Sequence, residues 1–423
     1  MKRFTVLFLI VLLVLAVQAE VKNVIFMIGD GMGVSHVTLA RAIKGERLAL
    51  DDFPYAGLQY TDSTDHNITD SAAAGSALAT GYKTKNGMIS MTPDYKARKT
   101  TLELFKEKGK KTGVVSTTRL THATPACFSS HIKARYMEYE IGEQQVNSGI
   151  EVFLGGGTKK YNDDTLALAE KNGYDIVKDR NSLVKTSSDK VLGLFSESHM
   201  SYELDRGLDE PSIALMTRKA IDLLENDNGF FLMVEGGRID HASHSNDAVG
   251  SIYDTLAFDK AVKEVLDYAK RRDDTLVVVT ADHSTGGLTL ARKKYKYYPE
   301  VLKGFSRTPD YIISQLNEDF SNVREVLAQY TDFEWSEEDI QKILKQKDCK
   351  RPTRYSLGGL ATSTFVRLIN DRAMISWSTN AHEGSMVPIF SYGPEAQRFS
   401  GMMDNTEIPR RIAESTDLNL IQK

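Results

Sequence analysis

Continuous apolar runs alternate along the chain with segments of helical periodicity. Four such runs lie at residues 24–28, 113–117, 230–234 and 275–279, and each is followed by glycine or polar residues. Runs of this kind are typical of strands that are buried on both faces of a parallel sheet. The hydrophobic pattern therefore predicts at least four parallel strands in the interior of the protein.

Helical periods fill the intervals between these runs. Apolar residues recur at helical spacing over 213–224, in a helix that we expect to be capped by Asp209 or Glu210, with Pro211 in its first turn. A second helix is predicted over about 247–271. Strands that alternate with helices predict an α/β fold, with a doubly wound, mostly parallel central sheet and helices on both faces.

The segment at about 291–377 interrupts this alternation. It opens with basic and aromatic residues and then holds short helical pieces, one of which has Ser336 as a predicted cap between Trp335 and Ile340. We interpret the segment as a smaller subdomain inserted into an α/β domain that spans residues 20–423. Its basic start is typical of a solvated face rather than of a nucleic-acid platform.

The first 19 residues have the features of a secretory signal peptide. Lys2 and Arg3 precede an apolar run, and small residues follow it up to Ala19. The run has about 14 residues, fewer than the roughly 20 that a membrane-spanning helix needs. We expect an exported protein, periplasmic or extracellular, with no membrane span after cleavage. An uncleaved membrane anchor is the alternative.

Composition narrows the class of protein further. The 423 residues include 53 Lys and Arg against 57 Asp and Glu, and 41% are hydrophobic. These values exclude a disordered or collagen-like chain, and the net charge of −4 gives no basic field for a nucleic-acid partner. The two cysteines, Cys127 and Cys349, form either one bridge or two unpaired residues.

Chemistry-bearing side chains follow the predicted strands. In an open α/β sheet, such side chains gather at the carboxyl ends of the strands. Several carboxylates in one crevice repel one another unless a cation is present, and histidines mixed with carboxylates point to zinc, whereas oxygen ligands suit magnesium. The residues concerned are Asp30, Asp70, Ser71, His122, Thr124, Glu235, Asp240, His244, Asp282, His283 and His382.

Ser71 is the candidate nucleophile among these residues. It opens a predicted helix at 71–78, where free backbone N–H groups favour an anion, although Asp70 or Ser71 could equally serve only as the helix cap. No Gly-x-Ser-x-Gly motif surrounds Ser71, which argues against an ordinary serine esterase. A serine beside a metal ion favours phosphoryl or sulfuryl transfer over acyl transfer.

Seven motifs, taken in order along the chain, resemble those of the alkaline phosphatase family. As a set they are specific, although no single one would be, and the likeness is weakest in the inserted segment. The motifs are the segment from Asn23 to Gly33, Thr69 to Gly75, His122 to Ala126, His131 to Arg135, Val234 to His244, Thr280 to Gly287, and His382 to Ser385.

The resemblance implies hydrolysis of phosphate monoesters through a phosphoserine on Ser71, with two zinc ions and one magnesium ion. It places Asp240, His244 and His382 on one zinc, Asp30, Ser71, Asp282 and His283 around the other, and Asp30, Thr124 and Glu235 on magnesium. It also implies that Arg135 clamps phosphate oxygens and that Asp70 orients Arg135. His241 would lie near bound phosphate, and His122 beside the magnesium ligands.

The sequence is also compatible with two other functions. A phosphodiesterase or sulfatase of the same superfamily is one alternative, and an exported metal- or phosphate-binding protein without turnover is another. The resemblance implies small-molecule phosphate monoesters as substrates and a homodimer as the assembly. We expect the remaining histidines to be structural or on the surface, namely His36, His66, His131 and His199.

Overall fold

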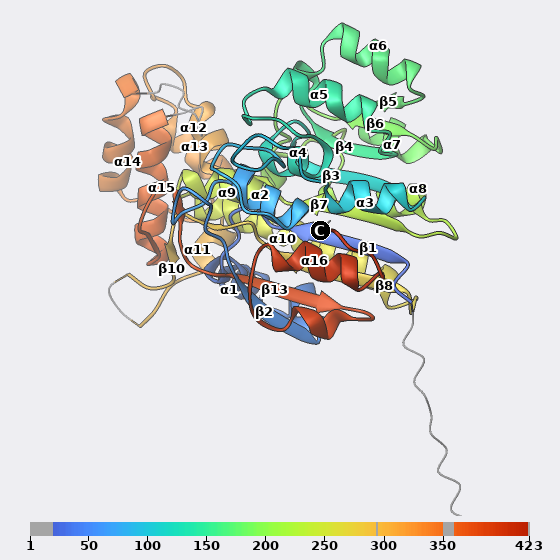
Figure 1. Cartoon of the computed structure of the whole chain (residues 1–423). Helices are drawn as coiled ribbons and strands as arrows, with labels where there is room; N and C mark the ends of the chain where they lie inside the picture. The colour runs from blue at the N-terminus through green and yellow to red at the C-terminus, as the bar shows by residue number, and fades with distance from the viewer. Residues whose placement is uncertain (1–19, 293–294, 350–358, 422–423) are drawn as a thin grey trace, which may run out of the picture.

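The computed structural model describes residues 20–292, 295–349 and 359–421, which include a ten-stranded sheet flanked by helices (Figure 1). The strands lie in the order β14-β2-β13-β8-β1-β7-β3-β4-β6-β5. Their bounds are β1 Asn23–Ile28, β2 Tyr55–Tyr60, β3 Lys111–Arg119, β4 Val152–Gly156, β5 Asp175–Val177, β6 Val191–Leu194, β7 Phe230–Glu235, β8 Thr275–Thr280, β13 Val387–Tyr392 and β14 Gly401–Asp404.

The sheet is mostly parallel, as the apolar runs predict. β1 pairs in parallel with β7 and β8, and β3 pairs in parallel with β4 and β7. Among the described strands of this sheet, only β13 runs against its neighbours, β2 and β8. The four predicted runs are therefore central strands, and the α/β fold class is confirmed.

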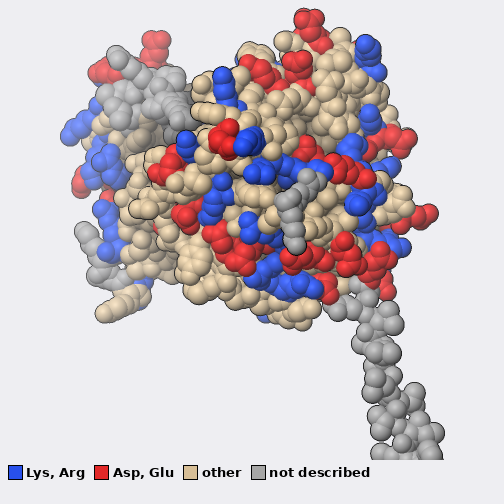
Figure 2. Space-filling view, in the orientation of Figure 1, with Lys and Arg blue, Asp and Glu red and all other residues tan. Residues whose placement is uncertain are grey.

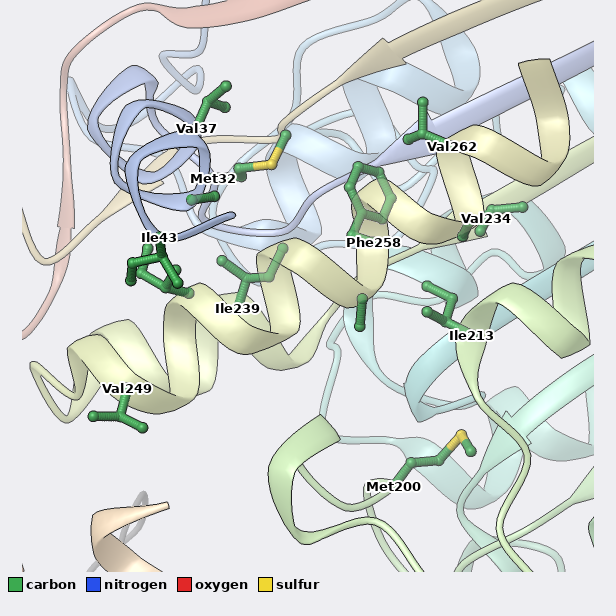
Figure 3. Packing of buried hydrophobic residues seen from close by; sticks show 14 of the residues in the cluster. Met32, Val37, Ile43, Met200, Ile213, Val234, Ile239, Val249, Phe258 and Val262 are labelled. Carbon is green, nitrogen blue, oxygen red and sulfur yellow. The ribbon is translucent and has the colours of Figure 1, made fainter. Parts of the chain in front are cut away.

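Helices cover both faces because successive strand residues point to opposite sides. Ile25 and Met27 of β1 belong to one core, and Val24 and Phe26 to the other. Figure 3 shows part of the first core, where α1, α9 Arg238–His244 and α10 pack together. The first face carries α1 Val34–Lys44, α7 Arg180–Lys185, α8 Ile213–Leu224 and α10 Ala248–Ala269, and the second carries α2 Ser71–Thr80, α3 Thr101–Glu107, α4 Ala123–Ser129, α5 Glu138–Asn147, α6 Asp163–Lys171 and α16 Glu407–Glu414.

The two helices predicted from periodicity are both present, with one change of boundary. α10 begins after Asp247, whose side chain accepts a hydrogen bond from the Gly250 N–H. α8 begins after Ser212, whose hydroxyl accepts from the Leu215 N–H, so neither Asp209 nor Glu210 is the cap. Pro211 precedes Ser212 and lies outside the helix, because serine supplies a capping oxygen nearer to the first apolar position.

Five α-helices follow β8 in the described part of the segment predicted to be inserted, residues 291–292, 295–349 and 359–377. The segment begins after β10 Leu288–Thr289 and ends at β11 Ser376–Trp377, and these two strands pair antiparallel. In Figure 1 these helices lie together at one side of the sheet. Ser336 caps α14 by accepting from the Asp339 N–H, as predicted. The helices are α11 Glu300–Lys303, α12 Pro309–Ser314, α13 Val323–Tyr330, α14 Glu337–Leu344 and α15 Gly359–Ala373.

The surface in Figure 2 shows basic and acidic side chains interspersed, and neither sign dominates this face. Within residues 20–292, 295–349 and 359–421, none of the helices combines the length and the apolar character that crossing a membrane requires. The predicted signal peptide, residues 1–19, lies outside the described residues.

Candidate active site

Three parallel strands bring acidic side chains to one edge of the sheet. Ile28 is in register with both Glu235 and Thr280. Asp30 therefore lies two residues beyond the end of β1, and Asp282 lies two residues beyond the end of β8. Glu235 is the last residue of β7, between β1 and β3. The carboxyl ends of the strands thus gather these acids, as the sequence predicted.

His382 reaches the same edge because β13 runs in the opposite direction. The residues that lead into β13 lie where the parallel strands end. There, β12 His382–Glu383 pairs antiparallel with β9 Ser284–Thr285, with His382 opposite Thr285. This pairing stacks the His382 ring on that of His283, with 3.5 Å between the ring centroids.

The turn after β1 leaves room for this assembly only because it contains glycine. Gly31 has φ +72°, and a Cβ added there would lie 2.8 Å from Thr285 Oγ1 and 2.9 Å from Asp240 Cα. A side chain would clash with the start of α9, which spans Arg238–His244. Gly31 thus allows the β1 turn to approach the helix that carries Asp240 and His244.

The first group of possible metal ligands, the Asp240 cluster, consists of Asp240, His244 and His382. His244 Nε2 lies 3.3 Å from Asp240 Oδ2 and 3.2 Å from His382 Nε2. The other ring nitrogen of His244 lies 2.7 Å from the Asn380 carbonyl, and that of His382 lies 2.9 Å from the Thr69 carbonyl. A carbonyl can only accept, so both Nδ1 atoms carry a proton, and both Nε2 atoms point to the space beside Asp240.

The second group, the Asp282 cluster, consists of Asp30, Asp282 and His283, which are fully buried. His283 Nε2 lies 3.2 Å from Asp282 Oδ2 and 3.6 Å from Asp30 Oδ1. Asp282 Oδ1 accepts from the Gly31 and His283 N–H groups, which fixes the carboxylate.

The third group, the Glu235 cluster, consists of Asp30, His122 and Glu235, and it shares Asp30 with the second. Glu235 Oε2 accepts from the hydroxyl groups of Ser116 and Thr118 on β3. Thr124, on the first turn of α4, has a fully buried hydroxyl group without a hydrogen-bond partner.

The concentration of negative charge perturbs the acids at this edge. Burial, and then the charge of Asp282, raises the pKa of Asp30 well above its ordinary value. Burial, and then the charge of Asp240, raises the pKa of Asp282 to about 8. Burial also acts to raise the pKa of Asp240, but His244 and His382 outweigh it and hold that pKa well below its ordinary value. A cation would remove the repulsion behind the raised values.

The unpaired atoms fit divalent cations. Oxygens buried without a hydrogen-bond partner cost free energy, and here they converge from different elements on common points. In the Asp240 cluster, the Nε2 atoms of His244 and His382 and the carboxylate of Asp240 lie close enough together to bind one cation. Histidine with carboxylate suits zinc, and the carboxylate and hydroxyl oxygens of the third group suit magnesium. The buried unpaired oxygens are Asp30 Oδ1 and Oδ2, Thr124 Oγ1, Glu235 Oε1 and Asp282 Oδ2.

Ser71 is the first residue of α2, and its side chain does not cap the helix. Its Oγ lies 3.2 Å from His283 Nε2. Asp70 is the cap, since its Oδ1 accepts from the Ala73 and Gly87 N–H groups. The Ser71 hydroxyl is thus directed to the Asp282 cluster.

Arg135 lies beside Ser71 because Asp70 holds it there. Arg135 Nη1 donates to Asp70 Oδ2 at 2.9 Å, and Nη2 lies 3.1 Å from His122 Nε2. One carboxylate therefore both caps the serine helix and positions the arginine. This arrangement aims a guanidinium fork at the space before Ser71, where it suits a phosphate group.

A cavity of about 1220 Å³ opens over these groups, and its walls include residues that the sequence analysis did not single out. His199, expected to be structural or on the surface, is instead in this wall, with its ring centroid 4.3 Å from that of His241. Tyr202 and Arg238 also line it. His199 and Tyr202 follow no predicted strand. Arg238 lies within the motif from Val234 to His244, but the sequence analysis assigns it no role.

The other histidines lie outside the cavity wall. His36 is buried with its Nε2 3.0 Å from the Ser243 hydroxyl, His131 pairs with Glu103 at 2.9 Å, and His66 is exposed. Cys127 is a free, buried thiol that packs against α2, while the side chain of Cys349 is outside the described part of the chain.

Comparisons with known proteins agree with this geometry. The family described as "Alkaline phosphatase" matches residues 21–418. The chain is 38% identical to alkaline phosphatase 3 of Bacillus subtilis over 426 aligned positions, covering 95% of this chain and 90% of that protein. It is 32% identical to the repressible alkaline phosphatase of Saccharomyces cerevisiae, covering 94% of this chain and 82% of that protein.

Solved structures show the same fold. The cold-active alkaline phosphatase of Shewanella sp. superposes with a TM-score of 0.87 at 30% identity, covering 93% of this chain and 99% of that one. The Thermus thermophilus alkaline phosphatase gives a TM-score of 0.85 at 30% identity, covering 95% and 92%. A mutant alkaline phosphatase of TAB5 with Mg bound in its M3 site gives a TM-score of 0.72 at 29% identity, covering 95% and 99%.

Proposed function

Because this chain belongs to the alkaline phosphatase family, and is therefore a metal-dependent hydrolase of phosphate monoesters, we propose that it acts through a phosphoserine on Ser71 at a site for two zinc ions and one magnesium ion. The single observation that supports this best is that three ligand clusters adjoin one another beside Ser71, through the shared Asp30 and the stacked rings of His283 and His382. The Asp282 cluster contacts the serine directly, through the 3.2 Å approach of His283 Nε2 to Oγ.

We assign the ligands by the chemistry of each cluster. Asp240, His244 and His382 would hold one zinc, and Asp30, Asp282, His283 and Ser71 would surround the other. The oxygens of Asp30, Thr124 and Glu235 would hold magnesium, with His122 beside them. The TAB5 structure with Mg in its M3 site supports magnesium at a third position.

Divalent cations bound in these clusters would lower the pKa of the serine hydroxyl and of a water molecule, and would counter charge on the leaving oxygen. The chain's own residues supply the rest. The Asp240 cluster lines the cavity, and the fully buried Asp282 cluster adjoins it through the stacked rings of His382 and His283. Ser71 lines the same cavity.

Hydrolysis then takes two displacements at phosphorus. Arg135 binds two phosphate oxygens, and Asp70 holds the guanidinium in place. Ser71 Oγ gives up its proton to water and bonds to phosphorus, and the bond from phosphorus to the alcohol oxygen breaks, so that this oxygen takes up a proton from water and leaves as the alcohol. Water next attacks the phosphoserine, which releases inorganic phosphate and restores the serine. Two displacements leave the configuration at phosphorus unchanged.

We also propose that residues 20–423 act as one catalytic domain, with the helices between β10 and β11 as an inserted subdomain beside the cavity. Thr308, Asp310, Tyr311 and Ser314, at and within α12, line that cavity. Export through residues 1–19 and assembly as a homodimer remain proposals that rest on the sequence and on the family.

Metal analysis combined with activity tests this function. The purified protein should contain about two zinc ions and one magnesium ion per chain and should hydrolyse p-nitrophenyl phosphate. Removal of the metals with a chelator should abolish turnover, and adding back zinc and magnesium should restore it. Full turnover in a sample verified to be free of metal would contradict the proposal.

A further inference from the structure

Arg238 is a cation in the cavity wall with no acidic partner. Its Nη1 lies 2.8 Å from His241 Nδ1, and its Cζ lies 3.7 Å from the centre of the Tyr202 ring. Its Nε is buried without a hydrogen-bond partner. Within the described residues, no carboxylate oxygen lies within the 4.0 Å that defines an ion pair with Arg238.

The other arginines of the cavity are neutralised. Arg135 pairs with Asp70 at 2.9 Å, and Arg119 forms two hydrogen bonds with Glu138, at 2.7 and 3.0 Å. Among the described residues, Arg238 is therefore the arginine of this wall that forms no direct ion pair with a carboxylate. A partly buried guanidinium that lacks a carboxylate is suited to receive an anion from solution.

The rings of His122 and His241 lie between Arg238 and Arg135, the proposed phosphate-binding arginine beside Ser71. Arg135 Nη2 lies 3.1 Å from His122, the ring centroids of His122 and His241 are 5.4 Å apart, and His241 contacts Arg238. An arginine can only donate, so the facing nitrogens of His122 and His241 accept and carry no proton.

These neutral imidazoles and nearby arginines favour an anion over a further metal ion. His122, His199 and His241 are close enough together to be considered as metal ligands. However, each lies against an arginine N–H group, from Arg135, Arg119 and Arg238 respectively. A divalent cation there would face three guanidinium groups, whereas an anion would be attracted by them.

The nearby carboxylates do not neutralise Arg238. Asp205 accepts two hydrogen bonds from Thr308, at 2.9 and 2.6 Å, and Asp310 accepts one from Thr362 at 3.0 Å. Asp254 accepts from the Glu203 N–H, and burial raises its pKa well above the ordinary value even though Arg238 opposes that shift. None of them forms an ion pair with the arginine among the described contacts.

We propose that Arg238, held by stacking on Tyr202, is the anion-binding residue of a second subsite that receives a second phosphate carried by the leaving group. The inference rests on the proposed function, because it assumes that the first phosphate is bound by Arg135 and attacked by Ser71. The substrate class is that of phosphoanhydrides, of which inorganic pyrophosphate is the simplest and nucleoside diphosphates are larger examples.

The reaction at this subsite balances without a further reagent. Ser71 Oγ bonds to one phosphorus of pyrophosphate as the bond from that phosphorus to the bridging oxygen breaks. The departing inorganic phosphate carries away the bridging oxygen and its charge, beside Arg238. Water then cleaves the phosphoserine, so that one pyrophosphate and one water give two inorganic phosphates.

The test compares two substrates in the same protein preparation. For the metal-loaded enzyme, kcat/KM is measured with inorganic pyrophosphate and with phenyl phosphate, whose leaving group carries no phosphate. Arg238→Gln should lower the ratio of pyrophosphate to phenyl phosphate by about tenfold or more, since a charge-assisted hydrogen bond is lost. Arg238→Lys, which keeps the charge, should recover part of the ratio.

Arg218→Gln is the matched control, because Arg218 lies half-exposed on α8 and its removal changes the net charge equally. It should leave the ratio unchanged. Calorimetric titration with methylenediphosphonate, which cannot be hydrolysed, provides a binding measurement. Arg238→Gln should weaken its affinity about tenfold and leave that of inorganic phosphate within about twofold.

The outcomes separate this inference from the proposed function. If Arg238→Gln lowers kcat/KM equally for both substrates, or for neither of them, while phenyl phosphate is still hydrolysed through Ser71, the second subsite is refuted and the proposed function stands. If Ser71→Ala retains turnover of phenyl phosphate, the proposed function itself fails. Because each ratio is taken within one variant, partial loss of folded protein does not alter the result.

Discussion

The Thr285 hydroxyl donates a 2.6 Å hydrogen bond to Asp240 Oδ1, and Thr285 Oγ1 also lies 3.2 Å from His283 Nδ1. Asp240 belongs to one ligand cluster and His283 to the next. A single buried hydroxyl therefore fixes the relative position of two clusters, although it belongs to neither. Mutation of groups that orient ligands in this way typically lowers metal affinity by about 10- to 100-fold.

Thr285→Val should weaken zinc binding without unfolding the protein. Valine has nearly the same shape as threonine, but it cannot donate to Asp240. The zinc concentration that gives half-maximal activity after chelation should rise about 10- to 100-fold. Excess zinc should restore kcat, because the ligands themselves are intact. Thr289→Val, at an exposed position on β10, is the control, and an unchanged zinc requirement in Thr285→Val would refute the role of this hydroxyl.

Removing the metals should make stability strongly dependent on pH. Burial raises the pKa of Asp282 to about 8 and raises those of Asp30 and Glu235, whereas an unfolded carboxyl group titrates near 4. Between these values the folded protein binds more protons than the unfolded chain, so its stability falls as the pH rises. The unfolding temperature of the chelated protein should decrease from pH 5 to pH 8.

The metal-loaded protein is the comparison for this experiment, because its cations offset the buried carboxylates. The gap between the unfolding temperatures of the loaded and chelated proteins should therefore widen with rising pH. A gap that stays constant from pH 5 to pH 8 would show that the three carboxylates are not the groups neutralised by metal.

Arg135 should contribute to phosphate binding directly, and Asp70 should contribute indirectly by holding Arg135 in place. Arg135→Gln should reduce kcat/KM for p-nitrophenyl phosphate by about 100-fold or more, since a charged donor to the transferring group is lost. Asp70→Asn should reduce it less, because asparagine can still accept from the Ala73 N–H but no longer pairs with Arg135. Inhibition by inorganic phosphate should weaken in the same order.

Lys133→Gln supplies the control for the loss of charge, since Lys133 is exposed and lies two residues before Arg135. Its kinetics should match those of the unmodified enzyme. An Arg135→Gln variant that is inhibited by phosphate as strongly as the unmodified enzyme would refute the clamp.

His36 should make the protein sensitive to acid. Its ring is buried, its Nδ1 accepts from the Gly33 N–H, and burial lowers its pKa to about 4. Below its ordinary pKa of about 6.5 the unfolded chain binds a proton that the folded chain does not, so stability is lost as the pH falls from 6.5 toward 4. The full loss is about 3 kcal/mol.

Urea unfolding at pH 7 and pH 5 tests this contribution, with metals removed from all samples. His36→Asn, whose side-chain oxygen can accept from Gly33, should become more stable relative to the unmodified protein as the pH falls from 7 to 5, because the buried carboxylates affect both proteins equally. His66→Asn alters an exposed histidine and should behave like the unmodified protein. The same pH-dependent change in all three proteins would contradict the assignment to His36.

The central strands were predictable because their apolar runs are long and uninterrupted. The patterns at 24–28 and 275–279 predicted two buried strands of a parallel sheet, and the structure shows that these two strands are neighbours. The reversed direction of β13 was not predictable, because periodicity carries no information on which neighbour a strand pairs with. The start of α8 was misplaced since three polar residues near it could each serve as a cap, and Ser212 is the one nearest to the helix.

The predicted ligands come together because each follows a strand or opens a helix at one edge of the sheet. Asp30 and Asp282 are examples in which strand register alone brings the groups close. His199 is different, because it lies in the loop after β6, and neither strand nor helix periodicity places a loop residue. Arg238 lies in one of the seven motifs, but a motif does not show which side chains surround it. That no carboxylate pairs with Arg238 among the described residues is seen only from the folded structure.

Trapping the covalent intermediate tests the central claim most directly. The metal-loaded enzyme is mixed with excess p-nitrophenyl phosphate, quenched in acid within milliseconds and analysed by peptide mass spectrometry. The account predicts a phosphate group on Ser71 that is absent from Ser71→Ala and from the chelated enzyme. Continued turnover in Ser71→Ala, or phosphate found on another residue during turnover, would contradict it.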